Sequence, residues 1–280
     1  MPLPLPAAGR AATGRAAAAA RSYWTLSRAP RYSLLFALPL LVLYETLAAA
    51  LGDLAGVRVR NGADVWLKTP FVAVFGPRGP VVFGALIVLV SVVLVLRDVR
   101  RTREGVRGGV FARMLGESVL LAGLCAVAVG VATAQLLRVL PGATLAMMPQ
   151  AAAPAPAAPG AGGVAALGGP AQLMVSLGAG LYEELLFRVV LVGAIRAGTR
   201  RGLGMGPRAA GALAVALGAL LFALAHHVGP MGDPLTADRF VFRAVAGLFF
   251  SAVYVLRGFG IAAWTHALYD VGVLALTAGR

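Results

Sequence analysis

The chain has 280 residues, of which 59% are hydrophobic and only 13% are charged, and its formal net charge is +14. So few charged residues exclude an ordinary water-soluble globular protein. A large positive charge can indicate a nucleic-acid-binding protein. Here, however, the arginines lie between apolar blocks rather than on one compact basic face, which is typical of a membrane-topology signal. We therefore expect the lipid bilayer as a partner and no nucleic acid.

Apolar residues form long blocks, most of them near the roughly 20 residues that a helix needs to cross a bilayer core. Helices are expected because unpaired backbone groups are unfavourable in hydrocarbon. The fold class we expect is all-α, a polytopic transmembrane helical bundle of about seven to eight spans, multi-pass in the cell membrane. Trp66 to Phe75 could instead be an interfacial or re-entrant piece. The blocks run over residues 33–54, 81–96, 116–139, 171–195, 209–228, 240–256 and 260–278.

Composition divides the chain into four segments. Residues 1–32 are rich in Ala, Pro and Arg and are interpreted as a disordered basic N-terminal tail. Residues 33–140 form an N-terminal three-helix membrane segment. Residues 141–170 are a Pro-, Ala- and Gly-rich loop, and residues 171–280 form a C-terminal membrane core of four helices. The distribution of Arg favours an N-terminus on the cytoplasmic side, so seven spans would leave the C-terminus outside.

Three ionisable residues fall close together in the fourth block, where an isolated charge is costly. Glu184 and Arg188 are four residues apart with the acid first, so we expect them to form a structural ion pair on one helix face. Glu183 points about 100° away from Glu184 on an α-helix and has no local counter-charge. A carboxylate without a fixed partner can exchange a proton, which makes Glu183 the candidate general base.

Histidines occur at only three positions, and two of them lie at helical spacing from another notable residue. Phe222 and His226 share one face of the fifth block, and His266 and Asp270 share one face of the seventh. Taken singly, each of these residues is more often structural. Together with Glu183, however, they can be satisfied within the membrane only by meeting in the bundle interior, as catalytic groups do.

These residues resemble the motifs of the CPBP family of intramembrane proteases, which includes the type II CAAX prenyl endopeptidases and the bacterial Abi proteins. The resemblance covers about residues 171–278 and makes 171–280 a CPBP-like catalytic membrane core. It implies that Glu183 and His226 activate a water, that His266 and Asp270 line an oxyanion site, and that the substrate is a membrane-associated peptide or protein. The matching motifs are Glu183-Glu184-x-x-x-Arg188, Phe222-x-x-x-His226 and His266-x-x-x-Asp270.

Metal dependence stays open on chemistry alone. Glu183, His226 and His266 could hold Zn²⁺ with a water in the fourth position, but the same groups suffice for metal-free hydrolysis, and we expect no obligatory metal or other cofactor. Two other functions would also explain buried ionisable groups: a proton-coupled transporter and a catalytically inactive membrane scaffold. The substrate, and whether it is prenylated, does not follow from the sequence.

Overall fold

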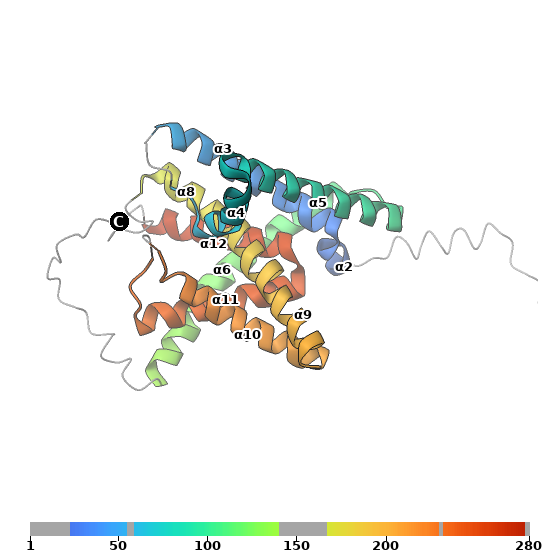
Figure 1. Ribbon diagram of the computed structural model, residues 1–280. Helices are drawn as coiled ribbons and strands as arrows, with labels where there is room; N and C mark the ends of the chain where they lie inside the picture. Colours follow the sequence, from blue (N-terminus) through green and yellow to red (C-terminus); the bar gives the residue numbers. More distant parts are fainter. Residues whose placement is uncertain (1–22, 55–58, 140–166, 230–231, 278–280) are drawn as a thin grey trace, which may run out of the picture.

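The computed structural model describes residues 23–54, 59–139, 167–229 and 232–277, and all regular secondary structure in this part of the chain is helical (Figure 1). The expected all-α class is therefore confirmed. The elements are α2 (Tyr23–Arg28), α3 (Pro30–Leu54), α4 (Gly62–Phe75), η1 (Gly76–Arg78), α5 (Gly79–Thr102), α6 (Gly108–Val139), α8 (Gly169–Gly178), η3 (Ala179–Val192), α9 (Gly193–Gly202), α10 (Pro207–Ala225), α11 (Ala237–Arg257) and α12 (Phe259–Thr277).

Six stretches of the described chain are long and apolar enough to cross a membrane, as expected for a multi-pass membrane protein. The fourth block of the sequence is not among them. It forms three consecutive elements, α8, η3 and α9, which continue into one another and none of which is long enough alone. The six stretches are Pro30–Leu51, Gly62–Thr102, Gly108–Val139, Pro207–Ala225, Ala237–Arg257 and Phe259–Leu276.

Helix α12 is the central element of the bundle, in contact with α2, α3, α6, α8, η3 and α11 (Figure 1). Small side chains make this possible, since Ala262, Ala263 and Ala267 are fully or almost fully buried. The approach of η3 depends on Gly180, because a Cβ atom there would lie 2.4 Å from the carbonyl oxygen of Ala263. The close contact between η3 and α12 holds two of the sequence motifs against each other.

Helix α4 covers the segment for which a re-entrant or interfacial piece was the alternative. It has 14 residues and ends at Gly76, whose positive φ of 58° turns the chain through η1 into α5. Fourteen residues rise only about 21 Å, which is too short to cross a bilayer core. Helix α4 instead packs against α5 and η3.

Helical structure begins earlier in the chain than expected. We predicted a disordered segment over residues 1–32, but Tyr23–Arg28 forms α2 and α3 begins at Pro30. Specific contacts explain the order: the Tyr23 hydroxyl donates to Glu117, and buried Arg31 pairs with Glu104 at 2.8 Å. Residues 1–22 and most of the Pro-, Ala- and Gly-rich loop predicted over 141–170 lie outside the described residues.

Candidate active site

The π-helical segment η3 carries the Glu-Glu-x-x-x-Arg motif, and two of its charged residues form a buried cluster with α12. The Glu184 Oε2 and Arg188 Nε atoms lie 3.2 Å apart, and the other Glu184 oxygen accepts a hydrogen bond from His266 Nδ1 at 2.8 Å. The sequence predicted the ion pair but not the histidine. Glu184 therefore joins η3 to α12 as well as balancing the charge of Arg188.

Glu183 points away from this cluster and has two differently engaged carboxylate oxygens. Its Oε1 accepts a hydrogen bond from Asn61 Nδ2 at 2.8 Å. Its Oε2 has no hydrogen-bond partner in the described structure and lies 3.6 Å from His226 Nε2. One oxygen is thus fixed, and the other faces the imidazole.

His226 directly follows the C-terminal end of α10, and its ring orientation is fixed by its own helix. Nδ1 lies 2.7 Å from the backbone oxygen of Phe222. Because a carbonyl oxygen only accepts hydrogen bonds, this contact requires the proton on Nδ1. In the neutral imidazole, Nε2 then presents a lone pair towards Glu183. Phe222 packs against this ring, with centroids 4.5 Å apart.

His266 and Asp270 occupy the α12 side of the same region. The His266 ring stacks on Phe250 at a centroid distance of 4.2 Å and an interplanar angle of 16°. Its Nδ1 bonds to Glu184, so Nε2 is the nitrogen that faces Asp270, with Oδ2 at 3.7 Å. Phe222 lies between the two histidines, its ring centroid 6.2 Å from that of His266.

The two adjacent glutamates differ in the exposed fraction of their side chains. The side chains of Glu184 and Arg188 are 0% and 1% exposed, whereas those of Glu183 and His226 are 13% and 17% exposed. Asp270 is 27% exposed. The full burial of Glu184 and Arg188 suits a structural role for this pair, and Glu183 and His226 remain the candidates for a chemical one.

For a metal, the sequence offered Glu183, His226 and His266 as ligands. Among the residues that the structure describes, no group of three or more His, Cys, Asp or Glu side chains is close enough to hold a metal ion. His266 also commits its Nδ1 to Glu184. The described structure therefore brings Glu183 and His226 together as a pair.

Two contributors to the site were missed from the sequence. Asn61 begins α4 in the N-terminal half, where no motif was recognised, and Phe250 is one of many aromatic residues in apolar blocks. Asn61 could have been noted as a polar residue placed before an apolar run, although this pattern alone only predicts a helix N-cap. Nothing in the sequence separates Phe250 from ordinary core residues.

The fold and the site together define a multi-pass helical membrane protein with a Glu–His site enclosed by its helices. Residues 168–272 match the family model described as Type II CAAX prenyl endopeptidase Rce1-like, so this part of the chain is a domain of that CPBP family. The family is one of peptidases that act on protein substrates. No curated protein and no solved structure matches the chain.

Proposed function

We propose that the protein is an intramembrane endopeptidase of the CAAX-protease/Abi type in the cell membrane, which hydrolyses a peptide bond with a water activated by Glu183 and His226. The observation that carries the proposal is the 3.6 Å separation between the unpartnered Glu183 Oε2 and His226 Nε2. Both are acceptor atoms in the tautomer that Phe222 imposes on His226. A water with its two hydrogens directed at these atoms is held with its oxygen free to attack.

The proposed reaction uses this pair in the following way. Glu183 takes one proton from the water as the oxygen bonds to the scissile carbonyl carbon, and a tetrahedral oxyanion forms. Collapse of the oxyanion breaks the carbon–nitrogen bond, and the proton held by Glu183 passes to the departing amine. Glu183 returns to its carboxylate form, so atoms and charges balance over the cycle.

We assign His266 and Asp270 to stabilisation of the oxyanion. In its doubly protonated form, His266 donates from Nδ1 to Glu184 and can donate a hydrogen bond from Nε2 to the oxyanion, with no proton transferred in this step. Asp270, beside Nε2, would stabilise that imidazolium. Preorganised donors of this kind are worth most in a site that excludes water, and His266 is 4% exposed.

The proposal is tested with purified protein in phospholipid vesicles, incubated with a farnesylated CAAX-type peptide and with a set of unmodified peptides. Mass spectrometry should detect defined cleavage products, at a rate that strong metal chelators leave unchanged because the Glu–His pair needs no metal. Loss of activity to chelation and recovery with added Zn²⁺ would instead assign Glu183, His226 and His266 as metal ligands.

The same vesicles separate the peptidase from the two other candidate functions. A proton-coupled transporter would give no peptide product from any substrate but would carry protons across the vesicle membrane, in a manner that depends on Glu183. A catalytically inactive scaffold would give neither product nor flux.

A further inference from the structure

We infer that Asn61 is a positioning residue for Glu183, supplied by the N-terminal half of the chain and lying outside the family match. The inference rests on the proposed function, because it assigns Glu183 the role of base. Asn61 is 3% exposed, and its side-chain amide donates to Glu183 Oε1 at 2.8 Å. This bond fixes one carboxylate oxygen and leaves Oε2 as the one that faces His226.

Asn61 is itself held by three contacts. Its Oδ1 accepts from the backbone N–H of Ala63 at 2.9 Å as the N-cap of α4, and its own backbone N–H donates to the hydroxyl of Tyr44 at 3.2 Å. The third contact is close packing against Gly178. Asn61 lies so near this glycine that a Cβ atom at position 178 would be 2.9 Å from the Cβ of Asn61. With its oxygen used by the cap, the amide has only its N–H groups free for Glu183.

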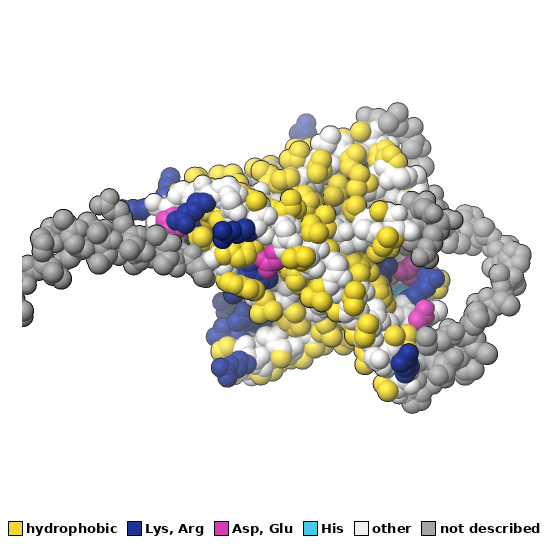
Figure 2. Space-filling view, turned by 180° about the vertical axis from the view of Figure 1, so that it is seen from behind, with side chains coloured by type: hydrophobic (Ala, Val, Ile, Leu, Met, Phe, Trp, Pro, Cys, Tyr) yellow, Lys and Arg dark blue, Asp and Glu magenta, His cyan; other side chains and the backbone are white. Residues whose placement is uncertain are grey.

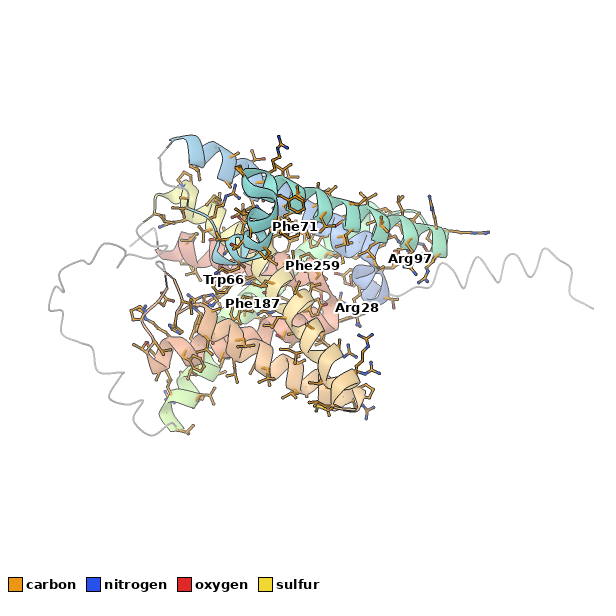
Figure 3. All side chains as sticks on the ribbon, viewed as in Figure 1. Arg28, Trp66, Phe71, Arg97, Phe187 and Phe259 are labelled. Carbon is orange, nitrogen blue, oxygen red and sulfur yellow. The ribbon has the colours of Figure 1, made fainter. Side chains whose placement is uncertain are left out.

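A buried charged network fixes this corner of α4 against α3 and η3. Tyr44 donates to Asp64 at 2.9 Å, and Lys68 bridges Asp64 at 2.6 Å and Glu45 at 2.7 Å. Tyr182, the residue before Glu183, donates to the same Glu45 at 2.5 Å. Figure 3 shows α4, marked by Trp66 and Phe71, beside η3, marked by Phe187. The network therefore sets both the Asn61 side chain and the backbone that carries Glu183.

Asn61→Asp tests the inference, because Asp is an equally good N-cap and keeps the backbone contact with Tyr44 but cannot donate to Glu183. The expected result is a fall in kcat of about 10- to 100-fold with KM changed by less than about two-fold, as for a displaced catalytic group. The melting temperature should fall by about 5 °C, because two carboxylates then face each other. Thr69→Val is the control, since exposed Thr69 bonds only to its own helix.

A double variant that exchanges the amide and the carboxylate between positions 61 and 183 distinguishes loss of this contact from a general destabilisation of α4. In Asn61→Asp/Glu183→Gln, the glutamine amide can donate to the new carboxylate, so the melting temperature should return to near the wild-type value while cleavage stays absent. Equal melting temperatures for Asn61→Asp and the double variant, or full kcat in Asn61→Asp, would overturn the inference. Melting requires no substrate, so the contact is decided even if the proposed peptidase function fails.

A second inference concerns the side of the membrane that the site faces, and it is carried by the distribution of charge. Arg97, Arg100 and Arg101 end α5, and Arg200 and Arg201 end α9. Arg28 and Arg97 lie at the same end of the molecule in Figure 3. The positive-inside rule places this Arg-rich end in the cytoplasm.

His226 lies towards the other end. A short connection, residues 203–206, joins α9 to α10, and His226 follows α10 at its far end. Polar residues surround this end: His227 Nδ1 contacts the backbone oxygen of Asp233, and Asp233 pairs with Arg243 at 3.1 Å beside a cavity of 380 Å³. Figure 2 shows histidine atoms at one end of the bundle, among acidic and basic side chains, and further basic groups at the opposite end.

We therefore propose that the His226 end of the site faces the non-cytoplasmic side and takes peptide segments presented at that face. This also rests on the proposed function. Leu235→Cys and Leu203→Cys are a matched pair for the test, because the wild-type side chains are 67% and 72% exposed and the native Cys125 is buried.

An impermeant maleimide added to right-side-out vesicles should label Leu235→Cys, and it should label Leu203→Cys only after permeabilisation. The reverse pattern would overturn the proposed orientation. The labelling needs no peptidase activity, so this result and that of the cleavage assay can be judged separately.

Discussion

Replacement of Glu183 by Gln is expected to lower peptide cleavage by about 10²- to 10⁴-fold, the range that a general base commonly contributes. The variant keeps the size of the side chain and an oxygen that can accept from Asn61, as Glu183 Oε1 does at 2.8 Å. It loses the carboxylate that takes the proton from water. Single-turnover cleavage in vesicles measures the loss, and the melting temperature should stay near that of the wild type.

Two further variants, Glu183→Asp and His226→Ala, test whether the loss of cleavage comes from the carboxylate and its histidine partner. The aspartate keeps a carboxylate at a greater distance from His226 and should retain partial activity. His226→Ala removes the second acceptor for the water and should resemble Glu183→Gln. Wild-type turnover by Glu183→Gln would refute the assignment of Glu183 as the base and would point to another group in the same cavity.

The membrane fold could be predicted from the sequence because its determinants are local. Apolar blocks predicted the helices α3, α5, α6, α10, α11 and α12, and the described part of the chain contains six stretches able to cross a membrane. The π-helical conformation of η3 was not predicted, because a pattern of apolar residues does not distinguish a π-helix from an α-helix. The N-terminal boundary was also misplaced, because α2 is ordered by tertiary contacts such as that between Tyr23 and Glu117.

The candidate site was predictable where its residues share a helix. Glu184 and Arg188, Phe222 and His226, and His266 and Asp270 each stand four residues apart, and each pair is close in space. The spacing of charges within a membrane helix carries that information.

Contacts between helices were not predictable in the same way. Asn61 and Glu183 are 122 residues apart, and His266 and Glu184 are 82 residues apart. These pairings depend on how η3 packs against α4 and α12, which one sequence does not specify. The contact with His266 adds a requirement at Glu184 beyond the ion pair.

Arg188→Met is expected to reduce the amount of folded protein sharply, because it leaves Glu184 as a buried carboxylate without its cation. Removing one partner of a buried pair typically costs about 3 to 5 kcal/mol. Arg188 also lies over the Phe222 ring, with Cζ 4.4 Å from the centroid, so part of the site packing is lost with it. A fall in melting temperature on the order of 10 °C is expected in purified protein, together with low abundance in membranes.

The double variant Glu184→Gln/Arg188→Met should recover much of this loss. The glutamine is neutral, so no buried charge lacks a partner, and its side-chain oxygen can still accept from His266 Nδ1, as Glu184 does at 2.8 Å. Simple charge reversal at the two positions should fail, because an arginine at position 184 would face the Nδ1 proton of His266. If Arg188→Met matches the wild type in abundance and melting temperature, the buried pair carries no structural weight, and Glu184 would have to be reconsidered as a second candidate base.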